Sequence, residues 1–336
     1  MPCFHNHINY PLMPAPTISQ PLNFGQRLLF GLICVLIWPV SALPLCIHYL
    51  FSDLVLFPLV FHVAGYRRKI VQKNLHASFP EKTEAELKQI ERSFYHWFCD
   101  YIVETLKLFS MSKSEMKRRI TFEDLEETKR VLAEGKSIGL YLGHYCNWEW
   151  VSSLPLWVDN DMSFSQVYHV LESPVMDHLM LYIRARMGSE NVSMQEILRY
   201  IIGKQRAHQP FMTGFIADQT PLWNSIHLWL PFLNHPETPV FTGTERLLKR
   251  FGLAAFYLDI RRVRRGYYAV RLVLMTEDTK DVPDFQLTEH YFRLLEANIR
   301  RQPELWLWSH NRWKRTREEF ERRQQDAHAE HQAEQQ

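Results

Sequence analysis

Apolar positions dominate the N-terminal part of the chain, and mixed apolar and polar positions fill the rest. Residues 28–52 contain no Asp, Glu, Lys or Arg, and an uncharged run longer than about 18 residues can cross a bilayer. A second apolar run, residues 54–64, is too short to cross alone and should lie in the membrane interface or against the protein. We therefore predict a membrane anchor and interfacial segment over residues 28–64, with the spanning part kinked at Pro39 and Pro44.

The charges beside this anchor predict its orientation. One positive residue precedes it and four follow it closely: Arg27 before, and Arg67, Arg68, Lys69 and Lys73 after. Because positively charged flanks stay on the cytoplasmic side, everything after residue 65 is expected to be cytoplasmic. A signal peptide cleaved after residues 40–42 and a buried hairpin of a soluble protein are the alternatives. Both are disfavoured, because the run continues past residue 42 and is long for a hairpin.

Beyond the anchor the pattern predicts a long helix followed by alternating strands and helices. Thr83 and Glu86 form a capping box, after which apolar residues recur at helical spacing to Tyr101. Strand-like runs cover residues 137–142, 164–169, 211–217, 254–260 and 267–275. Helical patterns cover residues 193–204, 244–251 and 287–301. This alternation predicts an α/β fold: a mixed sheet with helices on both faces.

These patterns divide the chain into four segments. We expect a flexible arm at residues 1–27, the anchor at 28–64, and a cytoplasmic domain at 65–314. Residues 315–336 are highly charged and then rich in Gln, Ala and His, which predicts a solvated helix that frays into a disordered tail.

Composition narrows the classes of function. Hydrophobic residues make up 46% of the chain and charged residues 23%, so a sizeable core can form. The net charge of +2 is too balanced for a dedicated nucleic-acid binder. The five cysteines form no Cys-x-x-Cys pair, which argues against a zinc site or a disulfide framework and fits a reducing compartment. We expect neither a metal nor a cofactor.

Two short motifs fail on their context. Residues 135–139 match the Gly-x-Ser-x-Gly pattern, but the strand-like run follows Ser137, whereas a nucleophile elbow needs it before the serine. The same residues resemble the end of a phosphate-binding loop, but Arg130 stands where its first glycine must be.

A third motif fits its context. His-x4-(Asp/Glu) occurs at residues 48, 76 and 144, and only His144 follows an apolar strand and a glycine and leads into a helix, with Asn147 as its expected N-cap. Ligands bind at such strand-to-helix junctions in open α/β sheets. Glu149 could fix the imidazole tautomer and leave the other ring nitrogen as a base that deprotonates an alcohol. The alternative is a structural histidine bonded to a loop carbonyl.

Several ordered segments resemble one family. They are GYRRKIVQKNLHASFPE (65–81), LGHYCNWEW (142–150), VYHVLESPVMDHLMLYIRARMG (167–188), FIADQTP (215–221), Pro231-Phe232, the Thr-Gly-Thr at 242–244, and LWLWSHNRWKR (305–315). Together they resemble the lauroyl/myristoyl acyltransferases of late lipid A biosynthesis, within the His-x4-(Asp/Glu) lysophospholipid acyltransferases. The resemblance implies a glycerolipid acyltransferase-like fold at the cytoplasmic face of the bacterial inner membrane. It also implies acyl transfer from acyl carrier protein to a hydroxyl of a lipid A precursor.

The resemblance also suggests roles for individual residues. His144 would be the general base and Glu149 its orienting acid. Arg184 or Arg186 would bind a substrate phosphate or the oxyanion, with an exposed helix arginine as the alternative. Asp218 and Gln219 would form a substrate-side element, although Asp218 could instead cap a turn.

One position departs from this resemblance, and the roles of two other features stay open. His169 stands where the resemblance leads us to expect an arginine, which weakens a phosphate contact there. Cys146 is a conceivable thiol nucleophile, but two residues after His144 it need not face the same way. A basic cluster is either solvated surface or a docking patch for acyl carrier protein or anionic lipid; it comprises Lys249, Arg250, Arg261, Arg262, Arg264 and Arg265.

Two other functions remain open at this stage. One is acylation of a lysophospholipid or an amino lipid by the same chemistry. The other is membrane-tethered lipid binding without catalysis.

Overall fold

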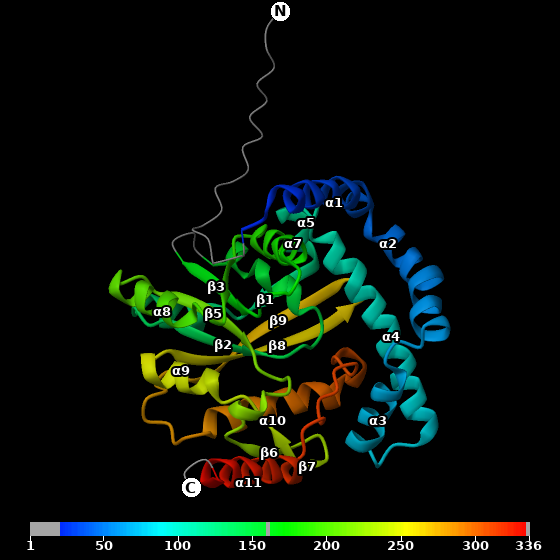
Figure 1. Ribbon diagram of the computed structural model, residues 1–336. Helices are drawn as coiled ribbons and strands as arrows, with labels where there is room; N and C mark the ends of the chain where they lie inside the picture. The colour runs from blue at the N-terminus through cyan, green and yellow to red at the C-terminus, as the bar shows by residue number, and fades with distance from the viewer. Residues whose placement is uncertain (1–20, 159–161, 334–336) are drawn as a thin grey trace, which may run out of the picture.

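The computed structural model describes residues 21–158 and 162–333, and its centre is a seven-stranded sheet (Figure 1). The strand order is β1-β9-β8-β2-β5-β3-β4. The strands are β1 (Ile120–Glu123), β2 (Ile138–Leu142), β3 (Ser163–Tyr168), β4 (Glu190–Ser193), β5 (Phe211–Ile216), β8 (Ala254–Arg264) and β9 (Tyr267–Thr276). Neighbouring strands are parallel except β8 and β9, which pair antiparallel. The predicted mixed sheet is confirmed.

Helices cover both faces of this sheet. In Figure 1, α7 (Pro174–Ala185) lies on one side, and α9 (Gly243–Phe251) and α10 (Gln286–Arg301) lie on the other. The remaining helices of the domain are α3 (Arg68–Ser78), α4 (Glu84–Lys107), α5 (Lys113–Arg119), α6 (Glu126–Ala133) and α8 (Ile197–Arg206). All five residues of β2 are buried, as expected of a parallel strand covered on both faces.

The five strand-like runs correspond to β2, β3, β5, β8 and β9, and the three helical patterns to α8, α9 and α10. The pattern missed the short strands β1 and β4 and a separate two-stranded hairpin, β6 (Trp229–Phe232) and β7 (His235–Pro239). These four strands have only four or five residues each, which is too few to show the alternation of apolar and polar positions that marks a strand.

The capping box at the start of α4 is present as predicted. The Glu86 amide donates to the Thr83 hydroxyl at 3.3 Å, and the Thr83 amide donates to the Glu86 carboxylate at 2.8 Å. The apolar stripe of α4 is buried, but the same helix also buries the carboxylates of Asp100 and Glu104. Buried carboxylates require hydrogen-bonding partners, and here these come partly from the N-terminal helices.

The apolar N-terminal part forms two helical stretches instead of one long kinked helix. Helix α1 (Phe24–Ala42) contains Pro39, and the chain bends at Leu43 and Pro44. The second stretch begins with α2 (Leu45–Phe51) and continues through π-helical turns, η1 (Ser52–Leu56) and η2 (Pro58–Val63). Residues 24–42 and 45–63 are each long and apolar enough to cross a membrane, by length and composition.

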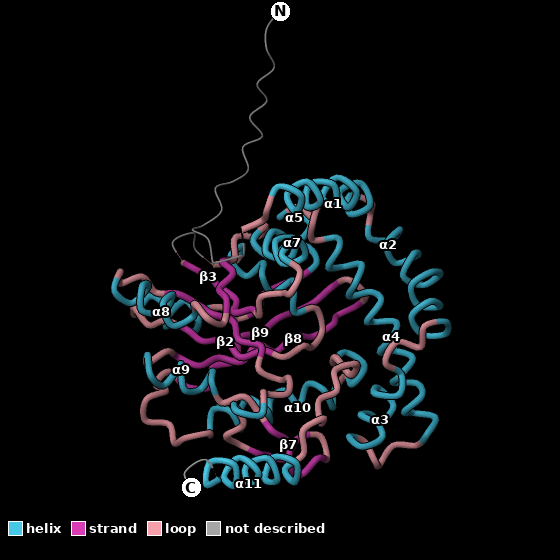
Figure 2. The backbone as a smooth tube through the Cα atoms, viewed as in Figure 1, coloured by secondary structure: helices cyan, strands magenta, loops and turns pink. Residues whose placement is uncertain are grey.

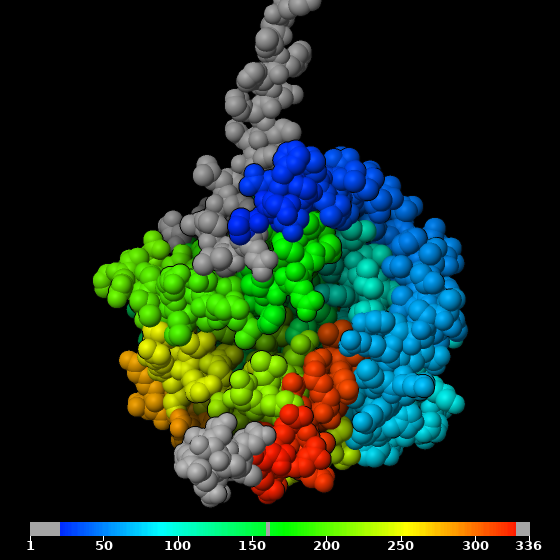
Figure 3. Space-filling view, viewed as in Figure 1, coloured from blue at the N-terminus to red at the C-terminus, as the bar shows by residue number. Residues whose placement is uncertain are grey.

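Both stretches lie along the outside of the domain, as the blue segments of Figure 3 show. Two of their serines, Ser41 and Ser52, face inward and are buried. Ser41 donates to the Ser110 hydroxyl at 2.8 Å, and Ser52 donates to the Asp100 carboxylate at 2.8 Å. Their apolar side chains face outward: Leu28, Leu32, Val35, Leu36, Leu50, Leu54 and Val63 are among the exposed ones. The arrangement is therefore the reverse of a soluble amphipathic helix.

The structure describes the two ends of the chain only in part. Residues 1–20 of the predicted arm lie outside the described residues, and residues 24–27 belong to α1. At the other end, the expected helix is present as α11 (Arg317–Ala333), which lies beside β7 in Figure 2. Phe320 contacts Trp229 of β6, and Arg317 pairs with Glu237 of β7.

Candidate active site

His144 and Asp218 come together because β2 and β5 are parallel neighbours. Leu142 pairs in register with Ile216, so the residues that follow each strand emerge at the same edge of the sheet. His144 lies two residues beyond the end of β2, and Asp218 lies two residues beyond the end of β5. This edge, at the carboxyl ends of parallel strands, is where α/β sheets bind ligands.

The Asp218 carboxylate is buried and fully engaged. One oxygen accepts from Nδ1 of His144 at 2.6 Å, and the other accepts from the His144 amide and the Trp306 indole, both at 2.8 Å. Burial alone would raise the pKa of Asp218, but the His144 ring and these hydrogen bonds hold that pKa below its usual value. An ionised Asp218 fixes the proton of neutral His144 on Nδ1 and leaves the lone pair on Nε2.

Gly143 allows this close approach. A Cβ atom at this position would lie 3.2 Å from an Asp218 carboxylate oxygen and 2.8 Å from a Leu295 methyl carbon. A larger residue would therefore push the carboxylate or helix α10 away from His144.

The second ring nitrogen of His144 faces Gln219. The two nitrogens, Nε2 of His144 and Nε2 of Gln219, are 3.2 Å apart, so the Gln219 amide donates to the imidazole lone pair. The His144 side chain is 20% exposed, and the edge of its ring contacts Trp148 with centroids 5.1 Å apart. A base with a partly accessible lone pair is suited to deprotonating an alcohol.

Glu149 does not bond to His144 as the sequence spacing suggested. Its two carboxylate oxygens accept from Nε and Nη2 of Arg184 at 2.7 and 2.6 Å. The chain turns away because Cys146 adopts a left-handed conformation, with φ of 54°. Asn147 then caps a 3₁₀ helix, η3 (Trp148–Leu156), by accepting from the Trp150 amide, which confirms it as the N-cap.

Glu149 and Arg184 form a largely buried salt bridge. The Glu149 side chain is 3% exposed and that of Arg184 is 21% exposed. Burial alone would raise the pKa of Glu149, but the Arg184 guanidinium holds it below its usual value. The fork of two parallel hydrogen bonds fixes the orientation of Arg184 on α7.

Arg186 and His169 have contacts away from His144. The Arg186 guanidinium donates to the backbone carbonyls of Phe109 and Met111, beyond the end of α4. These contacts hold Arg186 against the backbone after α4. Of the two candidate arginines, only Arg184 therefore pairs with Glu149. His169 is exposed after β3, with Nδ1 beside the Val170 carbonyl at 2.8 Å.

The Cys146 thiol is fully buried and faces strand β8. It donates to the Ile260 carbonyl at 3.7 Å, and burial raises its pKa. A thiol that resists ionisation in this way is a poor nucleophile.

The role of residues 305–307, which follow α10, was not predicted from the sequence. Besides the Trp306 indole on Asp218, the Leu307 amide donates to the His144 carbonyl at 3.1 Å, and the Cys146 amide donates to the Leu305 carbonyl at 2.9 Å. This segment therefore clamps the loop that carries His144. The residues were noted in the family resemblance, but no spacing connects them to His144.

His310 supports the other side of the site. Its Nε2 accepts from the amide of Thr220, the residue after Gln219, at 3.2 Å. Burial lowers the pKa of His310 to about 4, so the ring is neutral and can accept this hydrogen bond. The Thr220 hydroxyl also donates to the Arg312 carbonyl, which fixes the Gln219 loop.

The predicted basic cluster divides into two groups, on α9 and at the β8–β9 turn. Most of its members have local partners. Lys249 pairs with Asp284, Arg261 with Glu123, and Arg262 with Glu304. Arg264 stacks on Tyr267, and Arg265 pairs with Asp53 and Asp100. Much of the positive charge is therefore neutralised locally.

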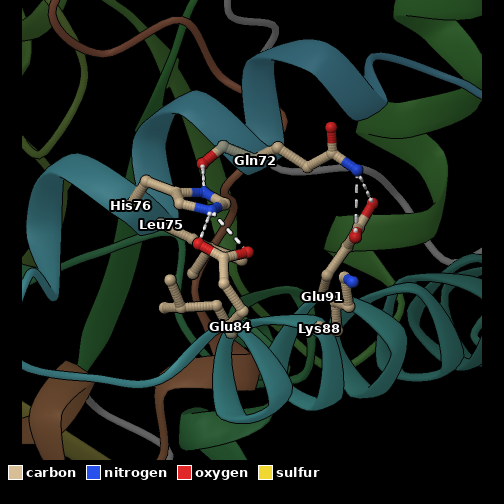
Figure 4. A pocket seen from close by; sticks show the side chains of 7 residues that line it. Gln72, Leu75, His76, Glu84, Lys88 and Glu91 are labelled. Atoms are coloured by element: carbon tan, nitrogen blue, oxygen red, sulfur yellow. Dashed lines mark hydrogen bonds and ion pairs between the residues drawn. The ribbon is translucent and has the colours of Figure 1, made fainter.

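A small cavity of about 190 Å³ lies between α3 and α4, away from His144. Figure 4 shows that polar side chains cross it: His76 meets Glu84, and Gln72 meets Glu91. These contacts join the two helices. Among residues 21–158 and 162–333, no three His, Cys, Asp or Glu side chains are grouped as metal ligands.

Comparison with known proteins identifies the family of the chain. Residues 21–315 match the family of bacterial lipid A biosynthesis acyltransferases. The chain is 23% identical over 253 residues to the lipid A biosynthesis palmitoleoyltransferase of Escherichia coli (strain K12), covering 74% of this chain and 79% of that protein. The lipid A biosynthesis acyltransferase of Shigella flexneri gives the same values. Since the match extends over most of its length, the chain belongs to the bacterial lipid A biosynthesis acyltransferase family and is an acyltransferase.

Proposed function

We propose that the protein transfers a fatty acyl chain from an acyl carrier protein thioester to a hydroxyl of a lipid A precursor. Family membership supports acyl transfer in lipid A biosynthesis. The observation that carries the mechanism is the 2.6 Å hydrogen bond between Nδ1 of His144 and the buried Asp218 carboxylate. It prepares Nε2 of His144 to act as a base.

In this mechanism the acceptor hydroxyl takes the place of the Gln219 amide on Nε2 of His144. The hydroxyl oxygen attacks the thioester carbonyl carbon while Nε2 takes its proton, and the imidazolium that forms is stabilised by Asp218. The tetrahedral intermediate then collapses, the carbon–sulfur bond breaks, and the proton passes from His144 to the departing thiolate. No covalent acyl-enzyme is required.

Arg184 is proposed to stabilise the negative charge that develops on the thioester oxygen. Glu149 uses Nε and Nη2 of Arg184, which leaves the Nη1 donors for an oxyanion. The role of Glu149 is then to keep Arg184 oriented, while Asp218 takes the role of orienting acid for His144.

The apolar surface of residues 24–63 supports attachment to a membrane, and we propose the cytoplasmic face of the inner membrane. The exposed apolar side chains would contact lipid tails, and the basic residues that follow, Arg67 and Lys69 among them, would face anionic headgroups. This location would bring the site to both a cytoplasmic acyl donor and a membrane-embedded acceptor.

The test is acyl transfer by purified protein in detergent, with acyl carrier protein thioester as donor and a lipid A precursor or a lysophospholipid as acceptor. We expect His144→Ala to abolish acylation of the lipid A precursor while the protein stays folded. Cys146→Ser is the matched control from the same loop and should retain activity. Near-normal rates in His144→Ala would refute the mechanism. Acylation of the lysophospholipid alone would show that the acceptor is a lysophospholipid and not a lipid A precursor. Lipid binding without any acyl transfer would favour a non-catalytic lipid-binding role.

A further inference from the structure

Glu104, on α4, is a fully buried carboxylate outside the proposed chemistry. It is 0% exposed and accepts three side-chain hydrogen bonds. They come from the Tyr49 hydroxyl at 2.7 Å, the Tyr268 hydroxyl at 2.7 Å and the Asn147 amide at 2.6 Å. The three donors come from an apolar N-terminal helix, from the sheet and from the loop after His144, so Glu104 joins three separate parts of the molecule.

Asn147 connects Glu104 to the site. Its side-chain amide donates to Glu104, while its side-chain oxygen accepts from the Trp150 amide at 3.1 Å and so starts the helix that bears Glu149. The Trp150 indole returns to the Glu104 carbonyl at 3.2 Å. Both ends of the Glu149 segment are therefore fixed to one residue of α4.

The neighbouring residue explains why the loop needs such support. Cys146 has a left-handed backbone, with φ of 54°, which is costly for a residue with a Cβ atom. Such a conformation persists only where its surroundings determine it. Fixing Asn147 therefore holds the turn that separates His144 from Glu149 and directs each to its own partner.

Tyr49 connects Glu104 to the membrane-facing surface. It lies in α2, whose neighbouring residues Ile47, Leu50 and Phe51 are exposed apolar side chains. The Tyr49 hydroxyl supplies the only donor to one of the two Glu104 oxygens among the bonds of the described residues. If α2 leaves α4, that buried oxygen loses its partner.

We propose that Glu104 is a positioning residue that makes the geometry of the His144–Glu149 loop depend on the seating of α2 against α4. The inference rests on the proposed function, because it assumes that His144 and the Glu149–Arg184 pair carry out the transfer. Its partner is the lipid-facing helix of this same chain, and its effect is on the rate of the chemical step. Substrate binding should be unaffected, because the hydrogen bonds of Glu104 and Tyr49 involve neither His144 nor Arg184.

The test compares Tyr49→Phe with Ser52→Ala in the full-length protein, under the acyl-transfer assay. Both changes remove one hydroxyl from the same stretch that donates to a buried carboxylate of α4. The Ser52 partner is Asp100, whose other partner is Arg265, so Ser52→Ala is a matched control. We expect Tyr49→Phe to lower kcat by about tenfold with KM unchanged, because small misplacements of reacting groups are costly. Ser52→Ala should keep its kcat.

A double-mutant cycle makes the test sharper. If Tyr49 acts through Glu104, Tyr49→Phe should cause no further loss of kcat in the Glu104→Gln background. Equal kcat values for Tyr49→Phe and Ser52→Ala, or losses that multiply in the double variant, would overturn the inference. Should Glu104→Gln fail to fold, the comparison of the two hydroxyl variants decides alone. Activity in His144→Ala would instead show that the proposed function itself has failed.

Discussion

Changing Asp218 to Asn tests the arrangement of the site most directly. In the structure one carboxylate oxygen accepts two hydrogen bonds, from the His144 amide and the Trp306 indole, and the other accepts from Nδ1 of His144. Asparagine has a single acceptor oxygen. That oxygen would keep the two N–H donors, so the new amide group would face Nδ1. The imidazole would then carry its proton on Nε2 and could no longer act as a base.

The size of the effect follows from this tautomer change. The same carboxylate-to-amide change in a hydrolytic triad lowers kcat by about 10⁴, equivalent to about 5 kcal/mol in the activation barrier. We expect a loss of this order for Asp218→Asn. Glu149→Gln should lose only about tenfold to a hundredfold, because it leaves the His144 ring untouched and weakens only the orientation of Arg184.

The assay is steady-state kinetics in detergent, following release of the acyl carrier protein thiol and confirming the acylated lipid by mass spectrometry. Circular dichroism of each variant controls for folding. If Asp218→Asn kept its kcat within tenfold, the tautomer argument would be wrong. If Glu149→Gln were the more damaging change, Glu149 would be the orienting acid in the active state, as the His-x4-Glu spacing first suggested.

Three further predictions concern stability and pH. Arg184→Met leaves the Glu149 carboxylate buried and unpaired, so we expect the free energy of unfolding to fall by about 3–5 kcal/mol in denaturant titrations; pairing it with Glu149→Gln should restore part of the loss. Gly143→Ala inserts a methyl group 2.8 Å from a Leu295 carbon, which should lower the unfolding free energy by about 1–3 kcal/mol and reduce kcat. Burial raises the pKa of Glu104 to about 7 despite its three donors. At this carboxylate the folded state therefore binds more protons than the unfolded state between about pH 4.5 and 7, so the contribution of Glu104 to stability should fall by about 3–4 kcal/mol as pH rises through that range. In thermal unfolding measured across the range, wild type should therefore lose stability relative to Glu104→Gln as pH rises, and identical slopes for the two proteins would contradict the assignment.

The sequence predicted the components of the site better than their pairing. His144 and Asp218 each follow a buried strand, and both were recognised as candidates. That they meet depends on β2 and β5 being neighbours, which is a property of strand order that local spacing does not contain. Glu149 was preferred as the partner of His144 because it is close in sequence, but a left-handed Cys146 turns it toward Arg184.

The apolar N-terminal part shows a related limit. A count of uncharged residues marks residues 28–52 correctly as apolar, and the interruption expected at Pro44 is present between α1 and α2. The inward-facing Ser41 and Ser52 are too few to change a hydropathy average. Their role appears only once Asp100 of α4 and Ser110, just beyond the end of α4, supply partners for them.

The clamp on Asp218 also fixes the order in which the site can be completed during synthesis. Trp306 lies 88 residues after Asp218 in the chain, so at about 5–20 residues per second the ribosome needs about 4–18 s to bridge them. By then both apolar helices have long emerged, while the loop carrying His144 still lacks the segment that holds it. A nascent chain can thus expose its apolar helices to a lipid surface well before the loop that carries His144 has the segment that holds it.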